Sequence, residues 1–274
     1  MSVAQEIIKD LLESKKLNSI DGYNEIKRIL FSQIIVIPYM QKYPNLIVRY
    51  RRHNNGENYF ENIADISYRT DVEKIKSFGR CNEPKQSIFY CNEFDYEKTG
   101  IVESVTVFRD KADSHEEIFT VGAWRVNEPL NLGVILPLKE QNGKLTELDE
   151  MRDIFEKHED SARFDDLKIF VNFLAKEFTL DTIKDNSNYH ITAAFTNYIK
   201  GKLPDLDGFM YASVKDKLEG INMALLPKTV DKKLKLVAAK KRHFKRTPGT
   251  NEFWEVDGNE TKDIDRKSGA IHWK

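Results

Sequence analysis

The segment LIVRYRR, residues 46–52, alternates apolar residues with Arg and Tyr after a short apolar start. Successive side chains of a β-strand point to opposite faces, so the pattern predicts a strand whose two arginines, Arg49 and Arg51, leave the sheet on the same side. Tyr50 is expected on the other face. The chain is therefore expected to contain a β-sheet in which residues 46–52 form a basic strand.

Two helical patterns precede this strand. Apolar residues recur at helical spacing before and after the break at Asp21-Gly22. The first group is Val3, Ile7, Leu11 and Leu12, and the second is Tyr23, Ile26, Leu30 and Ile34. We therefore expect residues 1–43 to form a helical N-terminal layer.

The rest of the chain mixes strands with helices. Strands are predicted in the apolar run 87–91, in GAWRV (122–126), LNLGVILPL (130–138), FMYAS (209–213), NMALLP (222–227) and LKLVAA (234–239). Helices are predicted at 71–77, 164–178 and 189–198, and a turn at 215–220. Strands in two clusters with helices between them favour an α+β fold over a regular βαβ alternation.

Three regions are expected from these patterns. Residues 1–43 form the helical layer, and residues 44–240 form one catalytic domain. After Ala239 the chain becomes basic, with the run KKRHFKR at 240–246, and its end is polar. Residues 241–274 are therefore expected to form a loosely held basic and polar tail.

The composition excludes several classes of protein. The chain has 274 residues, with 43 Lys and Arg against 44 Asp and Glu, and a net charge of −1 argues against a purely electrostatic binder of polyanions. Hydrophobic residues make up 40%, enough for a packed core. The longest apolar stretch, 29–40, is interrupted and shorter than the roughly 20 residues of a membrane span. With two cysteines, Cys81 and Cys91, and no export signal, a cytoplasmic location is expected.

Common catalytic motifs are absent from the sequence. It contains no GxxxxGK[ST], GxGxxG, HExxH or GxSxG pattern. Its six histidines are scattered without ligand spacing, and we expect no metal site. What remains is an ordered set of residues rather than a single motif.

That ordered set resembles the RES domain family, named for its arginine, glutamate and serine. It comprises Arg49-Tyr50-Arg51, Gly79-Arg80-Cys81-Asn82, Tyr90, Glu103, the block 207–213 that ends in Ser213, Asn222 and Pro227. The resemblance covers roughly residues 46–240. The order and spacing of the residues together make the match.

Two features depart from the usual pattern of the family. The turn after the GRxN-like motif is Glu83-Pro84-Lys85-Gln86, and Glu103 lies in GIVESVTVF, rich in β-branched residues, instead of an alanine-rich helix. Either Arg49 or Arg51 could match the family's first arginine. We favour Arg49, because a tyrosine follows it directly.

The resemblance implies an ADP-ribosyltransferase-like α+β fold with a mixed sheet and flanking helices. It also implies that NAD is the substrate, that no metal is needed, and that the protein is a toxin paired with an antitoxin protein. Such enzymes degrade NAD with phosphate or water, or transfer its ADP-ribose. The acceptor is not encoded in any motif of this chain.

The implied roles agree with the chemistry of NAD. Cleavage of the nicotinamide–ribose bond builds positive charge on the ribose, which a fixed carboxylate such as Glu103 stabilises. Arg80 and Arg49 would bind the pyrophosphate, because guanidinium groups bind phosphate oxygens in bidentate fashion. Tyr90 would stack on nicotinamide, and Ser213 would orient its amide or a phosphate. Residues expected at the site are catalytic Glu103, Arg80 and Ser213, and NAD-binding Arg49, Tyr50, Arg51, Tyr90 and Asn222.

Each of these residues also has an ordinary structural interpretation. A lone Glu in a β-branched run is commonly a solvated edge residue, and two arginines on one strand face commonly form surface ion pairs. Two further functions stay open: a nucleic-acid-binding module that uses RYRR and the basic run 240–246, and a non-catalytic interaction protein that docks through its N-terminal helices. Nucleic-acid binding is disfavoured by the net charge of −1.

Overall fold

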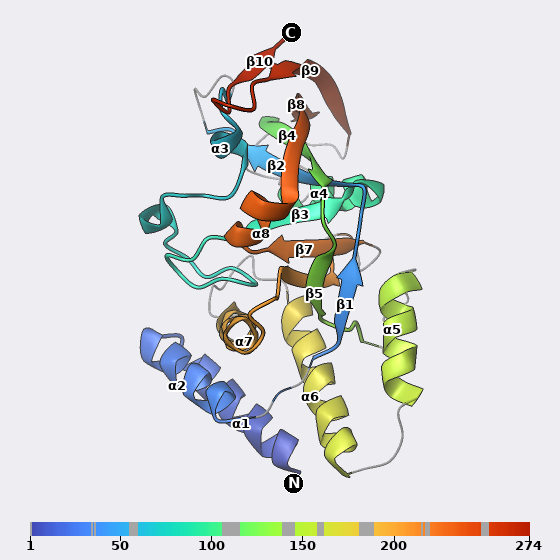
Figure 1. Ribbon diagram of the computed structural model, residues 1–274. Coiled ribbons are helices and arrows are strands. Elements are labelled where there is room, and N and C mark those ends of the chain that lie inside the picture. Colours follow the sequence, from blue (N-terminus) through green and yellow to red (C-terminus); the bar gives the residue numbers. More distant parts are fainter. Residues whose placement is uncertain are drawn as a thin grey trace.

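Helices and strands follow one another irregularly along the chain in this computed structural model (Figure 1). The structure describes residues 2–33, 35, 37–54, 60–105, 116–138, 146–157, 162–180, 189–214, 216, 220–247 and 252–274. Its helices are α1 (Val3–Lys16), α2 (Ile20–Phe31), α3 (Ile63–Ile66), α4 (Glu97–Ser104), α5 (Thr146–Lys157), α6 (Ala162–Thr179), α7 (His190–Lys202) and α8 (Pro227–Lys233), with 3₁₀ turns η1 (Val72–Lys74) and η2 (Phe94–Tyr96). Its strands are β1 (Tyr39–Lys42), β2 (Leu46–Arg52), β3 (Phe89–Glu93), β4 (Glu116–Val126), β5 (Leu130–Val134), β6 (Gly208–Ala212), β7 (Ile221–Leu225), β8 (Leu234–Arg246), β9 (Phe253–Ile264) and β10 (Ile271–Trp273).

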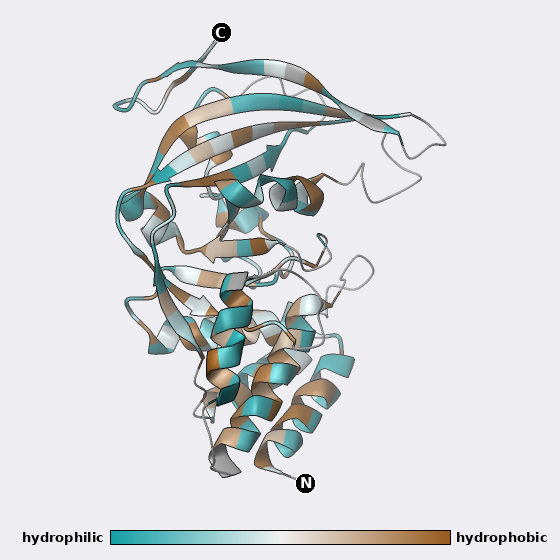
Figure 2. Ribbon diagram, turned by 90° about the vertical axis from the view of Figure 1, so that its right-hand side faces the viewer, coloured by the Kyte–Doolittle hydropathy of each residue, from teal (hydrophilic) through white to brown (hydrophobic). Residues whose placement is uncertain are grey.

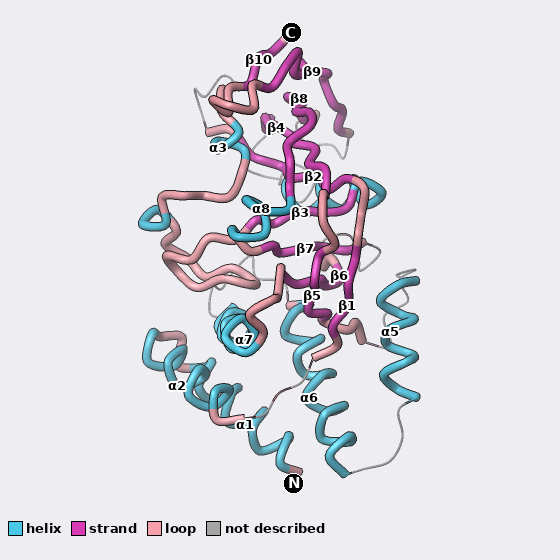
Figure 3. The backbone as a smooth tube through the Cα atoms, viewed as in Figure 1, coloured by secondary structure: helices cyan, strands magenta, loops and turns pink. Residues whose placement is uncertain are grey.

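The described strands form one mixed ten-stranded sheet in the order β1-β5-β6-β7-β3-β2-β4-β8-β9-β10. β5 and β6 are parallel, and the other neighbouring strands are antiparallel. Figure 3 shows the longer helices gathered around the part of the sheet that contains β1, β5 and β6, with the C terminus at the far end. The expected α+β class and mixed sheet are confirmed.

The sheet divides where β2 meets β3. These strands pair only at Ile47 with Glu93 and at Val48 with Asn92. Beyond that point, residues 49–52 of β2 pair with β4 alone, and residues 89–91 of β3 pair with β7. We call this division the fork.

The N-terminal helices form an outer layer over α6 and α7. α1 begins at a capping box in which Ser2 and Gln5 exchange hydrogen bonds, and the side chain of Ser19 accepts a bond from the Gly22 amide at the start of α2. α1 packs on α2 and α6, and α2 packs on α7. Figure 2 shows these helices at the end of the molecule that holds the N terminus, with apolar and polar segments alternating along them.

The helical layer is shorter than expected. α2 ends at Phe31, and residues 39–42 form β1, an edge strand antiparallel to β5. Pro38 keeps any helix from continuing into this strand, because proline disfavours helical geometry in the residue before it and cannot donate to a helix. Ile34, the last residue of the expected pattern, lies outside the described residues.

The basic segment after Ala239 is also different from the expectation. Instead of a loosely held tail, it continues β8 to Arg246, between β4 and β9. Phe244 of this segment is buried. Its basic side chains pair with acids of the neighbouring elements: Lys240 with Glu260, Arg242 with Glu97 and Glu255, and Lys245 with Glu116, which the ring of His243 also contacts. Charge matching across strands therefore orders a segment that looks solvated in the sequence.

Smaller differences concern element lengths. The helix expected at 71–77 is only the 3₁₀ turn 72–74, and the strand expected at 130–138 ends at Val134. The turn expected at 215–220 lies mostly outside the described residues. Within the described ranges, no helix combines the length and apolarity that crossing a membrane requires.

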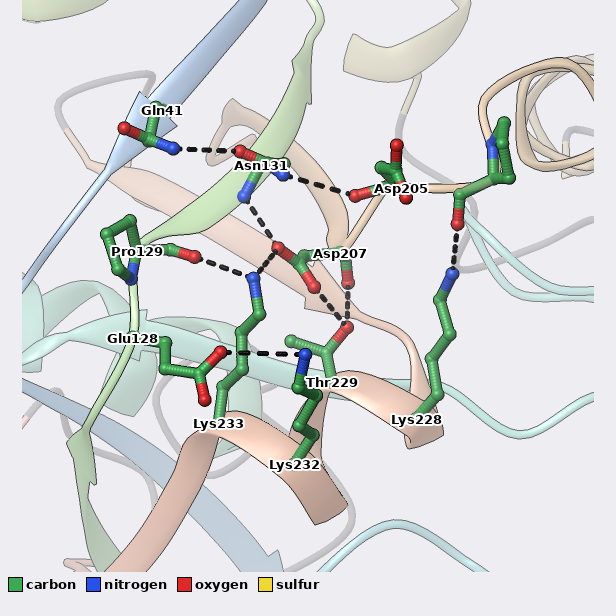
Figure 4. Close-up of polar contacts among 11 residues, drawn as sticks. Gln41, Glu128, Pro129, Asn131, Asp205, Asp207, Lys228, Thr229, Lys232 and Lys233 are labelled. Carbon is green, nitrogen blue, oxygen red and sulfur yellow. Dashed lines mark hydrogen bonds and ion pairs between the residues drawn. The ribbon is translucent and has the colours of Figure 1, made fainter.

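A buried carboxylate joins β5, β6 and α8. Asp207 accepts bonds from the Asn131 amide at 2.7 Å, the Thr229 hydroxyl at 3.0 Å and Lys233 Nζ at 2.6 Å (Figure 4). The backbone carbonyl of Pro129 also accepts from Lys233. This cluster fixes the start of β6, the strand that leads to Ser213.

Replacement of Asp207 by alanine should destabilise the chain strongly. The change leaves the Lys233 ammonium, whose side chain is only 12% exposed, without its carboxylate. We expect the free energy of unfolding to fall by about 3 kcal/mol in urea denaturation. Glu128→Ala is the control, because Glu128 is half exposed and lies 3.7 Å from Lys232; its effect should stay within about 0.5 kcal/mol. Equal losses in the two variants would contradict this role of Asp207.

Candidate functional site

A cavity of about 490 Å³ opens at the fork. Its described lining residues are Tyr50, Phe78, Gly79, Arg80, Tyr90, Cys91, Asn92, Glu103, Ser104, Tyr189, Tyr211, Asn222 and Met223. They come from both branches of the fork, from α4, and from the segments before β3 and α7. Residues far apart in the sequence therefore meet in one concave site.

Helix α4 lies across the fork and brings Glu103 to the cavity. Thr99 and Gly100 of this helix are buried. A Cβ atom on Gly100 would lie 2.8 Å from Cε2 of Tyr50 and 3.0 Å from Oδ1 of Asn92, so only glycine allows this close approach. Glu103 lies almost one turn further along the helix. Its setting is helical although its neighbours are β-branched.

The Glu103 carboxylate is bound by two side chains of the β6 and β7 region. Ser213 Oγ and Asn222 Nδ2 both donate to Glu103 Oε1, the latter at 3.0 Å. Asn222 Oδ1 in turn accepts from Asn92 Nδ2 at 2.8 Å. Ser213 is fully buried, and Asn92 and Asn222 are nearly so. The carboxylate is thus oriented by a chain of hydrogen bonds with little rotational freedom.

The turn 79–82 is tied to β3 by the hydroxyl of Tyr90. This hydroxyl donates to Asn82 Oδ1 and accepts from the Cys81 amide, both at 2.9 Å. Burial raises the pKa of Tyr90 well above its ordinary value, so the phenol stays protonated and can donate to Asn82. A Cβ on Gly79 would lie 2.9 Å from the same hydroxyl. These contacts explain the residue types at two positions of the GRxN-like motif, Gly79 and Asn82, and the tyrosine at position 90.

Arg80 projects from this turn into the cavity wall. Its Nη1 and Nη2 donate to the carbonyls of Phe178 and Leu180, at the C-terminal end of α6. Its guanidinium carbon lies 5.4 Å from the ring centroid of Tyr189 and 5.9 Å from that of Tyr211. A cation at a helix C terminus is favourable, and two aromatic rings limit its movement.

The N-terminal helices contact both the end of α6 that binds Arg80 and the residues beside the turn that carries Arg80. The carboxylate of Glu177 on α6, one residue before Phe178, accepts from Lys15 of α1 at 2.7 Å. Tyr23 of α2 donates to Glu83 at 2.7 Å, and its ring meets that of Phe78 edge-on at 4.6 Å. The outer helices therefore contact residues on either side of Arg80.

Tyr50 turns its hydroxyl toward β8 while its ring lines the cavity. The hydroxyl donates to Glu97 Oε1 at 3.2 Å and accepts from Arg242 Nη1 at 3.0 Å. Arg242 also forms an ion pair with Glu97, at the start of α4. The pKa of Tyr50 is raised, mainly by burial. This network joins the first turn of α4 to the long strands.

The structure brings six of the eight predicted site residues together. Arg80, Tyr90, Glu103 and Asn222 line the cavity with the ring of Tyr50, and Ser213 binds Glu103 beside them. Neither Arg49 nor Arg51 occurs among the described lining residues. Strand alternation places both on the opposite face of β2 from Tyr50, so the expectation that they bind the same ligand is not met by this arrangement.

Several lining residues were not among the predicted site residues, and three of them, Asn92, Tyr211 and Tyr189, bear directly on the site. Asn92 lies on the same face of β3 as Tyr90, two residues along, and strand alternation could have identified it. Tyr211 is related to Ser213 in the same way. Tyr189 carries no such signal, because only the packing of α7 on the sheet places it beside Arg80.

No protein-family model and no curated protein matches the chain. Among the described residues, no group of three or more His, Cys, Asp or Glu side chains could bind a metal ion. The site is thus defined by its own geometry: one oriented carboxylate, one guanidinium and several tyrosine rings around a cavity.

Replacement of Gly100 by alanine should disturb the site and the fold together. The added methyl group forces Tyr50 and Asn92 away from α4, and the free energy of unfolding should fall by about 1–3 kcal/mol. Gly201 is a matched control, because it is also helical and has no atom within 4 Å of an added Cβ. Gly201→Ala should stabilise by up to about 1 kcal/mol through helix propensity. A stabilised Gly100→Ala protein in urea denaturation would exclude the close packing of α4.

Proposed function

We propose that this chain consumes NAD by cleaving the bond between nicotinamide and ribose, on an ADP-ribosyltransferase-like fold. The observation that supports this most is the position of Glu103 in the cavity, with Ser213 and Asn222 bound to one of its carboxylate oxygens. The RES-like order of residues led to the same set. The acceptor of the ADP-ribosyl group is phosphate, water or a macromolecule.

The chemistry assigns one role to the carboxylate. The nicotinamide ring of NAD is already cationic and leaves as a neutral molecule, while positive charge builds on the ribose. A carboxylate held rigidly beside that ribose stabilises the charge more in the transition state than in the ground state. Ser213 and Asn222 orient Glu103, so little reorganisation is needed when the charge develops.

The other lining residues suit the rest of the substrate. Tyr90, Tyr189 and Tyr211 provide aromatic surfaces against which a flat ring can stack. Arg80 adds a positive charge that complements a pyrophosphate, and its anchoring on α6 keeps the guanidinium at the cavity. Together these features fit a dinucleotide with a cleavable cationic ring.

The nucleic-acid alternative gains no support from the basic run of β8. Lys240, Arg242 and Lys245 each have a carboxylate partner on a neighbouring element. Positive charges that are already paired attract phosphates less strongly. As part of the same proposal, an NAD-consuming enzyme of this kind acts as a toxin whose antitoxin partner restrains it.

The direct test is nicotinamide release from NAD by the purified chain and by Glu103→Gln. Glutamine keeps an oxygen that can accept from Ser213 and Asn222, but it lacks the negative charge. We expect wild-type cleavage without added metal, and a fall in turnover of about 100-fold or more, or about 3 kcal/mol, with NAD affinity little changed.

Two outcomes would count against the proposal. Intact NAD after prolonged incubation with folded wild-type protein would refute the activity. Turnover near the wild-type value in Glu103→Gln would place the catalytic carboxylate elsewhere. The exposed residue Glu73, which pairs with Lys85, provides a control: Glu73→Gln should leave turnover and affinity unchanged.

The role of Arg80 is tested by Arg80→Lys. An ammonium group cannot reproduce the planar guanidinium, which reaches the carbonyls of Phe178 and Leu180 at the end of α6 and also faces the cavity, so NAD affinity should fall by about tenfold or more in calorimetry. Arg28→Lys, at an exposed ion pair on α2, should bind NAD as the wild type does. Unchanged affinity in Arg80→Lys would remove Arg80 from the binding site.

A further inference from the structure

Arg49 reaches across the fork from the face opposite the cavity. Its Nη1 donates to the backbone carbonyl of Tyr90 at 2.9 Å, and its guanidinium carbon lies 4.8 Å from the ring centroid of Phe89. Residues 49 and 90 belong to the two branches that no longer pair as strands at this point. The side chain thus replaces a missing ladder hydrogen bond.

The position of Arg49 is unfavourable for a charge. The side chain is buried, its Nε has no hydrogen-bond partner, and no described carboxylate forms an ion pair with it. Burial, with the nearby positive charges of Arg51 and Arg69, lowers its pKa to about 10. A buried charge without a carboxylate partner is a weak source of stability, and an apolar side chain of similar length often suits such a site better. What arginine offers at position 49, and an apolar side chain does not, is therefore the hydrogen bond to the Tyr90 carbonyl.

Two contacts on opposite faces control the fork. On the cavity face, α4 presses between the branches, with Gly100 against Tyr50 and Asn92. On the other face, Arg49 binds the carbonyl of Tyr90. The helix fills the fork, and the arginine limits how far its branches separate.

We propose that Arg49 is a positioning residue that sets the opening of the fork, and with it the distance between the Tyr50 and Tyr90 walls of the cavity. The inference rests on the proposed function in that those walls bind the substrate. Ser213 and Asn222 hold Glu103 from the β6 and β7 side of the cavity, whereas Arg49 binds β3 at Tyr90. Loss of the Arg49 bond therefore affects substrate binding more than the chemical step.

The test compares Arg49→Met, Arg49→Lys and the control Arg125→Met. Methionine fills a similar volume without donating a hydrogen bond, and Arg125 is an exposed cation on β4. In Arg49→Met we expect hydrogen–deuterium exchange of peptides covering residues 88–93 to accelerate about tenfold, with exchange in α1 and α2 unchanged. KM for NAD should rise by about tenfold while kcat stays within about twofold.

Arg49→Lys distinguishes a role in positioning the cavity walls from a general contribution to stability. Lysine retains one donor for the Tyr90 carbonyl, so Arg49→Lys should recover part of the exchange protection and of the KM. Arg125→Met should match the wild type in both measurements. Unchanged exchange and KM in Arg49→Met would overturn the proposal, and so would faster exchange throughout the chain. A fall in kcat alone would also contradict it.

The exchange measurement needs no substrate. If the wild type fails to cleave NAD while Arg49→Met still accelerates exchange in residues 88–93, the proposed reaction is wrong, and the role of the Arg49 hydrogen bond in holding the fork is retained. If the wild type cleaves NAD and Arg49→Met matches it in KM and exchange, the reaction stands and the positioning role is refuted.

Discussion

The packing of Gly100 on Tyr50 and Asn92 determines the geometry of the cavity, because it seats α4 directly on two diverging strands. A side chain at this position would lift the helix, and Glu103 would move away from Ser213 and Asn222. The first turn of α4 is fixed separately through Glu97, Tyr50 and Arg242. One helix is therefore held at its start and its middle so that its last turn can present a carboxylate.

The turn 79–82 has a similar dependence on one group, the Tyr90 hydroxyl. A phenol that both accepts from Cys81 and donates to Asn82 defines where the turn lies above β3. Arg80 then meets the carbonyls at the end of α6. The contact of Arg80 with Leu180, about a hundred residues away in the sequence, therefore depends on the local bonds of Tyr90 to Cys81 and Asn82.

Much of this site could be predicted from the sequence, because alternation along a strand assigns residues to faces. It separated Tyr50 from Arg49 and Arg51, and the order of the motif residues selected Arg80, Tyr90, Glu103, Ser213 and Asn222. Alternation does not show which face of β2 borders the cavity, so it cannot correct the role in ligand binding that the resemblance implies for Arg49. The sequence does not predict that residues 240–246 are held in a strand, because the acids that pair with them lie on other strands. It does not predict β1 either, because the partner strand β5 lies about ninety residues away in the sequence.

The outer helices affect how the chain can be divided. Lys15 of α1 binds Glu177 beside the carbonyl that receives Arg80, and Tyr23 of α2 binds Glu83 just after the turn that contains Arg80. Removing residues 2–33 would expose Phe78 and leave the buried carboxylate of Glu177 without its cation. The N-terminal layer is thus no detachable module that could be truncated, exchanged or fused without regard to the cavity. A shortened chain that begins near residue 38 would lack both contacts, from Lys15 and from Tyr23, that support the segments around Arg80.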